Sequence, residues 1–340
     1  MNETVSPKPK VTVIIPARNE ESNIGRCLES LVTQPDVELE IIVVNDHSVD
    51  QTREIAATFA GVNVIEARPL EEGWTGKANA IWTAIPHAKG DWLIFTDADT
   101  CHKPGSLARS VEEASRQDAH FLSYSPAQET GGWWERLIQP LIFAELNMVF
   151  DYADVSNPAS EVAAANGQYI LCKRDRYNEI GGHAAVAGSL LEDVELARLA
   201  KRQGKIIFRF APDAVTCRMY RDFSELRDGW SKNLALLFPD SMKRAVRRAA
   251  ECLCLWFGPP ISIALLLKHH VLTGGILAAV TFIFYSLFMR RIRRAGYGWG
   301  SLTSVLGLPA LVYLLSRSSR HHRLGMVSWK GRNYGSRRKT

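Results

Sequence analysis

The chain has 340 residues, enough for one large domain or two ordinary ones. Its charge is divided, because residues 1–245 carry 26 basic and 35 acidic side chains, whereas residues 246–340 carry 15 basic side chains and a single acid, Glu251. The basic residues flank apolar runs and do not alternate with aromatic ones, which argues against nucleic acid as a partner and favours a membrane.

The start of the chain, Met1 to Lys10, is polar and contains no apolar core of the kind that a signal peptide needs. The six cysteines form no CxxC pair, so we expect reduced thiols. Together these features predict a polar N-terminal tail at 1–10 and a body that stays in the cytoplasm.

Short apolar runs alternate with helical patterns from residue 11 to about residue 125. This alternation predicts an α/β fold with a mostly parallel sheet and helices on both of its faces. The expected strands are 11–15, 41–44, 62–66, 92–95 and 121–124, and the expected helices are 20–32, 50–59, 77–85 and 104–116.

Polar side chains follow three of these strands: Asn19, Asp46, and the pair Asp97 and Asp99. The carboxyl ends of parallel strands meet at one edge of a sheet, where ligands bind. Residues two apart on a strand point the same way, so both carboxylates of the pair are expected to face one Mg²⁺ or Mn²⁺ ion. Taken alone, the pair could also form a turn or a helix cap, and Asp46 could be a turn or N-cap residue.

Two further segments carry candidate site residues. Lys77 follows Gly73 and Gly76 at the start of a helix, where a phosphate would be favoured, although it could be an ordinary surface lysine. Asp193 starts a helix that runs to about residue 202, and it could be a helix cap or a general base that takes a proton from an attacking hydroxyl.

Residues 132–153 predict a helix too polar to span a bilayer, lying either at the membrane interface or in an ordinary core. Residues 227–233 contain two cationic side chains and the indole of a tryptophan. There Trp230 could stack on a sugar or lipid while Arg227 or Lys232 meets a diphosphate, or the segment could be an amphipathic helix on the membrane.

Three apolar runs follow, at 252–267, 271–289 and 302–315. The second is long enough to span a hydrocarbon core of about 30 Å, and the first is marginal. Four arginines follow the second run directly, and eight basic residues lie in 317–340, so both clusters are expected on the cytoplasmic side. The first two runs then form a hairpin, and the third is re-entrant or interfacial.

Six motifs, taken in order, resemble glycosyltransferase family 2, the inverting enzymes with a GT-A fold, over residues 11 to about 235. They are PARNE (16–20), VVNDHSVD (43–50), GWTGKANA (73–80), FTDAD (95–99), LEDVEL (191–196) and RDGWSKN (227–233). The C-terminal apolar hairpin is similar to membrane-bound bacterial members that glycosylate lipids, including carotenoid- and hopanoid-associated ones. The final segment of this chain, WKGRNY at residues 329–334, is also similar to those members.

The resemblance implies a Rossmann-like GT-A domain at 11–245, membrane-embedded segments at 251–316 and a basic tail at 317–340. It implies that Asp46 contacts the base of a nucleotide sugar, usually uracil, and that Glu20 and the Pro16–Asn19 backbone border the nucleoside. Asp97 would hold the ribose or the metal, Asp99 would ligate the metal, and Asp193 would be the base.

The function implied is inverting, metal-dependent transfer of a sugar from a nucleotide-diphosphate sugar, UDP-linked in the usual case, to a lipid-type acceptor at the cell membrane. The QxxRW signature of processive members is absent, because residues 225–230 read ELRDGW, which favours a single transfer. Two alternatives are a polyprenyl phosphate acceptor and a catalytically silent membrane scaffold with the same fold.

Overall fold

The computed structural model describes residues 7–326, 328–329 and 332–333. The remaining parts of the predicted N-terminal and C-terminal tails lie outside the described residues, as does part of the WKGRNY segment. The chain divides into two units. Unit 1 comprises Met1–Glu129 and Phe150–Met219, and unit 2 comprises Thr130–Val149 and Tyr220–Thr340.

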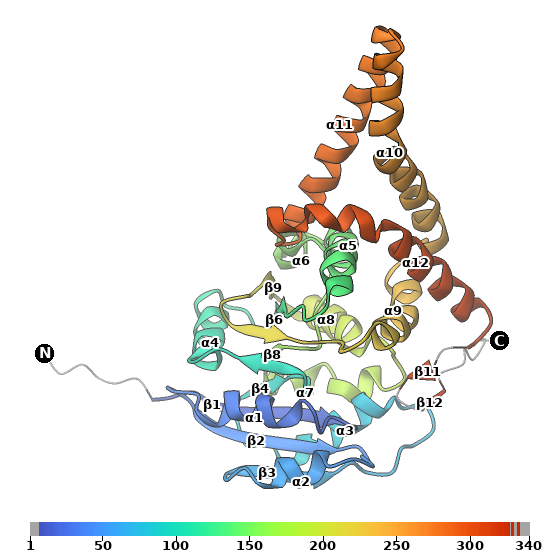
Figure 1. Ribbon diagram of the computed structural model, residues 1–340. Coiled ribbons are helices and arrows are strands. Elements are labelled where there is room, and N and C mark those ends of the chain that lie inside the picture. Colours follow the sequence, from blue (N-terminus) through green and yellow to red (C-terminus); the bar gives the residue numbers. More distant parts are fainter. Residues whose placement is uncertain (1–6, 327, 330–331, 334–340) are drawn as a thin grey trace, which may run out of the picture. The chain divides into compact units, whose positions relative to one another are not determined.

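A seven-stranded sheet in the order β3-β2-β1-β4-β8-β6-β9 forms the centre of unit 1 (Figure 1). All neighbouring strands are parallel except where β8 pairs with β4 and β6. A smaller sheet has the order β5-β10-β7. The strands are β1 (Lys10–Ala17), β2 (Glu38–Asn45), β3 (Val62–Glu66), β4 (Trp92–Phe95), β5 (Thr100–His102), β6 (Phe121–Ser125), β7 (Ala127–Gln128), β8 (Ile170–Lys173), β9 (Ile206–Phe210) and β10 (Val215–Cys217).

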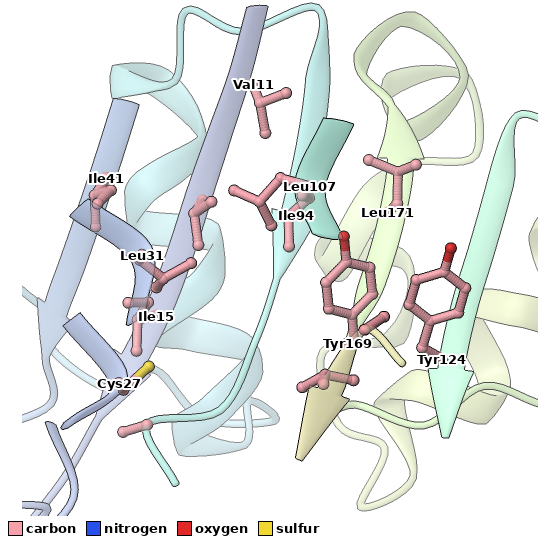
Figure 2. Packing of buried hydrophobic residues seen from close by; sticks show 14 of the residues in the cluster. Val11, Ile15, Cys27, Leu31, Ile41, Ile94, Leu107, Tyr124, Tyr169 and Leu171 are labelled. Atoms are coloured by element: carbon pink, nitrogen blue, oxygen red, sulfur yellow. The ribbon is translucent and has the colours of Figure 1, made fainter. Parts of the chain in front are cut away.

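Helices cover both faces of the large sheet. They are α1 (Ile24–Val32), α2 (Thr52–Ala57), α3 (Gly76–Ala84), α4 (Ser106–Arg116), α6 (Tyr152–Ser156), α7 (Arg174–Glu179) and α8 (Glu192–Gln203), with short 3-10 turns η1 (Ile85–His87) and η2 (Gly182–Val186). Side chains alternate along β1, so Val13 and Ile15 pack with α1 and α4, whereas Ile14 packs with α3 and α8 on the other face. Figure 2 shows the first of these two cores.

The predicted fold is confirmed, and the five expected strands are present. The first helix begins later than expected, at Ile24, because residues 21–23 form turns in which Asn23 N and Ile24 N both donate to Glu20 O. The pattern did not indicate β8, the antiparallel strand between β4 and β6, which shows the same apolar run as its parallel neighbours. A strand buried on both faces reads alike in either direction.

Unit 2 is mostly helical. Its helices are α5 (Trp133–Val149), α9 (Phe223–Leu237), α10 (Ser241–Leu267), α11 (Val271–Arg294) and α12 (Leu308–Arg323), with the 3-10 segment η3 (Trp299–Gly307) and a small ladder of β11 (Ser328–Trp329) and β12 (Arg332–Asn333). Three stretches among the described residues are long and apolar enough to cross a membrane: Ser241–Leu267, Val271–Arg294 and Gly300–Arg323. Membrane association of the chain follows from these helices.

Helices α10 and α11 form a hairpin whose turn is Lys268 to His270 (Figure 1). The two helices approach closely where Gly258 faces Thr281, since a Cβ at position 258 would collide with that side chain. Large apolar side chains cover the outside of the hairpin, among them Leu267, Leu272 and Phe282, which are 71–78% exposed. Such a surface suits lipid and not water.

A network of buried ion pairs connects α5 to the start of α10 and the end of α11. Glu145 is fully buried, and its carboxylate lies 2.7 Å from Arg248 and 3.2 Å from Arg244. Glu251 lies 2.8 Å from Arg248 and 3.0 Å from Arg291, so the arginines bridge the two acids. A buried carboxylate is tolerated when it is paired in this way. The basic residues at the ends of the apolar runs therefore also hold the helices together.

The third apolar run is longer in the structure than the 14 residues expected, because η3 and α12 together form the stretch Gly300–Arg323. Its leucine face is buried, and the polar end of α12 bonds to α9: Ser318 Oγ donates to Ser231 O at 2.7 Å. In Figure 1, α12 runs across the base of the α10–α11 hairpin, where it packs against α10. The interfacial or re-entrant placement stays a prediction.

Candidate active site

The ends of β1 and β2 are joined by hydrogen bonds that build one rim of the site. Asp46 N donates to Ala17 O at 2.8 Å, and Arg18 Nη1 donates to Asp46 O at 2.8 Å. Asn19, which has a left-handed φ of 54°, accepts from Val49 N at 3.0 Å through its side-chain oxygen. These bonds bring the predicted residues Asn19 and Asp46 to the same edge of the sheet, and Asp46 is 4% exposed.

The two remaining predicted rim residues have structural partners. Glu20 N donates to Thr52 Oγ1 at 2.7 Å, and the Glu20 carboxylate accepts from Asn23 at 2.8 Å. Pro16 lies inside β1, opposite Val44 of β2. Both residues therefore shape the loop between the first strand and the first helix.

Asp97 and Asp99 lie in the turn between β4 and β5, because β4 ends at Phe95 and β5 begins at Thr100. The expectation that a strand places both carboxylates on one side is therefore wrong. The chain reverses here since Thr100 Oγ1 donates to Asp97 O at 2.8 Å, and Thr96 Oγ1 donates to Gln168 O at 2.7 Å. The turn, and not the pleat of a strand, sets the directions of the two acids.

A buried histidine contacts the threonine hydroxyls on both sides of this turn. His102 is 3% exposed, and its Nε2 lies 3.2 Å from the hydroxyls of both Thr96 and Thr100. Burial lowers the pKa of His102 to about 3, so the ring is neutral at physiological pH. A neutral ring adds no cation to compete for Asp97 and Asp99.

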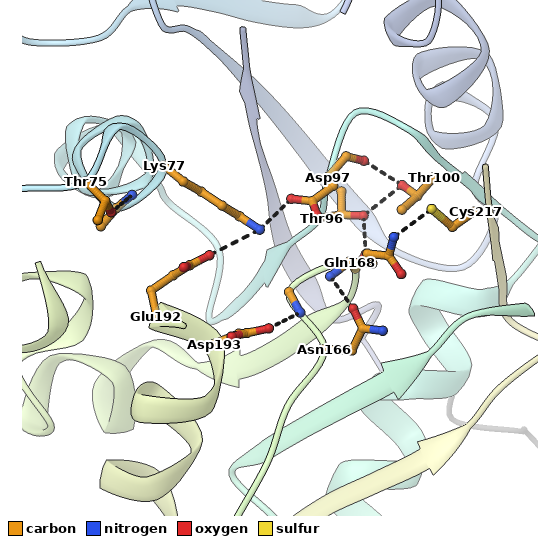
Figure 3. Close-up of polar contacts among 12 residues, drawn as sticks. Thr75, Lys77, Thr96, Asp97, Thr100, Asn166, Gln168, Glu192, Asp193 and Cys217 are labelled. Atoms are coloured by element: carbon orange, nitrogen blue, oxygen red, sulfur yellow. Dashed lines mark hydrogen bonds and ion pairs between the residues drawn. The ribbon is translucent and has the colours of Figure 1, made fainter. Parts of the chain in front are cut away.

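Four charged side chains from three elements converge at this edge of the sheet (Figure 3). Lys77 Nζ, on the first turn of α3, lies 2.7 Å from Asp97 Oδ1 and 3.3 Å from Glu192 Oε1. Asp193, next to Glu192 at the start of α8, completes the group. The helix start that carries Lys77 is held by its N-cap, because Thr75 Oγ1 accepts from Ala78 N and Thr75 N donates to Ala187 O at 2.7 Å.

Gly167 joins the lysine to the aspartate. Gly167 N donates to Asp193 Oδ2 at 2.9 Å. A Cβ built at position 167 would lie 2.8 Å from Lys77 Nζ and 3.4 Å from Asp193 Oδ2, so the ammonium fills space that only glycine leaves open. The segment around Gly167 therefore sets the distance between cation and carboxylate.

Burial, followed by the charge of Glu192, raises the pKa of Asp193 to about 6. The charge of Lys77 and the hydrogen bonds from Val194 N and Gly167 N act in the opposite direction. A carboxylate with such a pKa is a stronger base than an exposed aspartate and is still ionised at pH 7. This property suits the general-base role expected of Asp193.

The residues expected to meet the acceptor or the diphosphate lie on α9 in unit 2. Arg227 pairs with Asp228 at 2.8 Å, and Lys232 O lies 2.7 Å from His322 Nε2. Trp230 is 3% exposed and packs edge-on against Phe143 and Tyr220. Because both neighbours cover the indole, its burial argues against the expected stacking of a sugar or lipid on Trp230.

One residue of the cluster, Glu192, was not singled out from the sequence. Glu192 precedes the predicted base, and a helix start rich in acids reads as a favourable charge for the helix dipole. Only a pattern of acidic residues paired with a distant lysine could have indicated Glu192, and sequence spacing does not show such a pairing.

Comparison with known proteins identifies the family. Residues 12–181 match the family model described as Glycosyl transferase family 2, which is half of the chain. The chain belongs to glycosyl transferase family 2. It is also 27% identical over 341 residues to a 4,4'-diaponeurosporenoate glycosyltransferase of Staphylococcus aureus strain bovine RF122 / ET3-1, covering 95% of this chain and 88% of that protein. The same-named protein of strain MRSA252 is 28% identical with the same coverage.

The fold of this glycosyltransferase is also found in a mannosyltransferase from Pyrobaculum calidifontis, whose structure was solved in complex with GDP-Man and Mn²⁺. The match to that structure has a TM-score of 0.55 and 19% sequence identity. It covers 94% of this chain and 89% of the mannosyltransferase chain. The alternative of a silent scaffold is set aside, because the family and the named relatives are glycosyltransferases.

Among the residues that the structure describes, no group of three or more His, Cys, Asp or Glu side chains is placed to hold a metal ion. The acids at the β4–β5 turn still suit a cation, since Asp97 already holds the Lys77 ammonium at 2.7 Å. Mg²⁺ and Mn²⁺ need only one or two carboxylates when phosphate oxygens and water complete their shell. The donor set therefore fits a divalent ion that arrives with a diphosphate.

Proposed function

We propose that the protein transfers one sugar, with inversion, from a nucleoside-diphosphate sugar to a lipid-type acceptor in the membrane. The observation that carries the proposal is the convergence of Lys77, Asp97, Glu192 and Asp193 at the carboxyl ends of the strands of a family 2 glycosyltransferase. A cation, a candidate metal ligand and a candidate base lie there within reach of one small ligand.

The donor would lie along the rim formed by β1 and β2. Asp46 and the 16–20 segment are suited to the nucleoside, because buried polar groups and backbone amides meet at this edge. Lys77 is suited to the diphosphate, since it is a cation on the first turn of a helix. We expect uridine as the base, although the similar mannosyltransferase was solved with GDP-Man.

Asp99 and Asp97 would hold Mg²⁺ or Mn²⁺. Such an ion, when bound, stabilises the negative charge that develops on a departing diphosphate. The mannosyltransferase of similar fold contains Mn²⁺ in its solved complex, which supports the assignment. The chain's own part is to offer two carboxylates on a turn fixed by Thr96, Thr100 and His102.

Asp193 would take the proton from an acceptor hydroxyl as its oxygen attacks the anomeric carbon. Its carboxylate is held by Gly167 N at 2.9 Å, and its raised pKa of about 6 strengthens it as a base. The attack comes from the face opposite the diphosphate and inverts that carbon. The absence of a QxxRW signature supports one transfer and not a processive synthesis.

The acceptor is expected to be an apolar lipid, because the chain carries three helices suited to a membrane and its relatives are named for a carotenoid-type substrate, diaponeurosporenoate. Membrane attachment raises the effective concentration of such an acceptor at the site. The body is expected on the cytoplasmic side, since basic clusters flank the apolar hairpin.

A second candidate has an anionic acceptor. The name of the relatives denotes a carboxylate, and a carboxylate, like a polyprenyl phosphate, attacks without losing a proton. In that case Asp193 would not be needed as a base. The rate of Asp193→Asn separates the two candidates, because only a hydroxyl acceptor depends on proton removal.

The test uses the full chain in lipid nanodiscs with Mn²⁺, labelled UDP- and GDP-sugars, and extracts of bacterial membrane lipids. The expected result is label in a lipid product, lost in EDTA and in Asp99→Ala. A product that still forms with both the ion and the Asp99 carboxylate removed would contradict the metal assignment. Label in water-soluble products alone would contradict the lipid acceptor.

A further inference from the structure

The Lys77 ammonium lies where positive charge is needed for catalysis, and it is held by two acids at once. Its distances are 2.7 Å to Asp97 and 3.3 Å to Glu192. The Lys77 side chain is 31% exposed and that of Glu192 only 10% exposed, so neither ion is fully screened by water. Asp97 is therefore neutralised by the chain itself.

A divalent ion that binds Asp97 through Oδ1, the oxygen that Lys77 contacts, must displace this ammonium, because two cations cannot share one carboxylate oxygen at contact distance without strong repulsion. Glu192 offers a second place for the lysine. It lies on α8, a different element from the β4–β5 turn, so it can retain Lys77 after Asp97 is released. From there, the ammonium can still meet the oxygens of a diphosphate.

We propose that Lys77 is an exchangeable counter-ion of the metal site and that Glu192 is its positioning residue, so that the divalent ion binds well only together with the donor diphosphate. The inference rests on the proposed function. When a bare ion binds Asp97 and Asp99, Lys77 loses Asp97 as a partner. When the ion binds together with a diphosphate, Lys77 gains the phosphate oxygens as partners in place of Asp97.

The arrangement has a consequence for the order of binding. Free Mn²⁺ should bind weakly to the protein alone, and the nucleoside diphosphate and the ion should each increase the affinity of the other by the same factor. A site that stays closed to bare ions would not be filled by Mg²⁺ in the absence of donor. The pairing of Lys77 would then depend on whether the diphosphate is bound.

The experiment measures Mn²⁺ binding to the full chain in nanodiscs by electron paramagnetic resonance, with no nucleotide, with UDP and with GDP. In Lys77→Met, we expect free Mn²⁺ to bind at least about tenfold more tightly, because a nearby positive charge is removed. The gain in Mn²⁺ affinity on adding the nucleotide should fall at least about tenfold in the same variant.

Glu192→Gln should have the opposite effect on the free ion. Without Glu192, the lysine pairs with Asp97 alone, so free Mn²⁺ should bind more weakly than in the parent. The Lys77→Met/Glu192→Gln double variant should show a smaller effect of the glutamine than the single variant does, because the two residues act through each other. A general loss of structure would weaken binding in both single variants, so opposite signs exclude that explanation, and the smaller effect of the glutamine in the double variant identifies the exchange.

Two controls complete the design. Lys77→Arg keeps the charge and should keep the weak binding of free Mn²⁺. Lys89→Met removes an exposed lysine that precedes β4, at the end of the strand away from Asp97, and should leave both affinities unchanged.

Equal free-Mn²⁺ affinity in the parent and in Lys77→Met would overturn the exchange while leaving the proposed function intact, provided that UDP or GDP still increases Mn²⁺ affinity in the parent. If neither nucleotide changes Mn²⁺ affinity in the parent, the metal-dependent donor site of the proposed function fails, and the exchange fails with it.

Discussion

Asp193 accepts a hydrogen bond from Gly167 N at 2.9 Å, and the missing side chain of Gly167 leaves room for the Lys77 ammonium. One backbone position therefore orients a carboxylate and admits a cation. The relationship links the loop before β8 to the first turn of α8, two segments that no motif connects.

Gly167→Ala should keep the fold and lose activity. The new Cβ would lie 2.8 Å from Lys77 Nζ, the end of a flexible side chain that can move away, so the core should not change. We expect kcat/KM to fall at least about tenfold, which corresponds to about 1.4 kcal/mol of lost transition-state stabilisation.

The matched control for this variant is Gly25→Ala, whose Cβ would meet Ile55 at an ordinary 3.6 Å. Kinetics and thermal unfolding of both variants check the prediction. Parent-like kcat/KM in Gly167→Ala would show that the position of Lys77 does not matter for turnover.

Asp193→Asn should bind the donor normally and lose most of the transfer rate to a hydroxyl acceptor. General-base catalysis contributes roughly 10²–10⁴-fold, and an amide cannot accept the proton. Single-turnover rates at saturating donor measure the effect. A rate within about threefold of the parent would place the base elsewhere or indicate an anionic acceptor.

The activity of the parent should fall as the pH drops below about 6, because protonated Asp193 is no base and its pKa is raised to about 6 by burial and by Glu192. The measurement is the pH dependence of the single-turnover rate between pH 5 and pH 8. The residual rate of Asp193→Asn should lack this dependence, and an identical profile in the two proteins would contradict the assignment.

The raised pKa of Asp193 also affects the stability of the fold. The folded chain binds the Asp193 proton more tightly than the unfolded chain does, because in the unfolded chain the pKa of this carboxyl has its ordinary value of 3.8. The contribution of this residue to the free energy of unfolding is thus present below about pH 4 and is lost as the pH rises to about 6. Asp193→Asn should therefore unfold at pH 7.5 at the same temperature as the parent or a higher one. A clearly lower temperature would mean that the charge itself stabilises the fold.

Glu145→Ala should destabilise the helical unit, because it leaves Arg244 and Arg248 buried beside α5 with an acid removed. Breaking a buried ion pair from one side costs about 3–5 kcal/mol. Thermal unfolding in detergent, followed by circular dichroism, measures the loss. Glu112→Ala, at an exposed position of α4, is the control and should be neutral within about 0.5 kcal/mol.

Cysteine labelling tests the membrane topology. A cysteine in place of His269, in the turn of the α10–α11 hairpin, should react with an impermeant reagent from outside the cell. A cysteine in place of Arg323, at the end of α12, should not react from outside. The parent, with its six native cysteines, gives the background. Labelling of position 323 from outside would show that Gly300–Arg323 crosses the membrane completely.

The sequence by itself determined the alternation of strands and helices, the positions of Asn19, Asp46 and Asp97 after strands, and the apolar hairpin with its basic flanks. These features follow from local periodicity and from the number of residues that a bilayer needs, both of which are properties of neighbouring residues. The tertiary structure decided what depends on distant segments. Lys77, Asp97 and Glu192 are separated by 20 to 115 positions, and only the folded sheet brings them to contact distance. Likewise, the sequence allowed Trp230 to stack on a sugar or lipid, but Phe143 and Tyr220 bury it, because packing between helices is fixed by side chains that the local pattern does not contain.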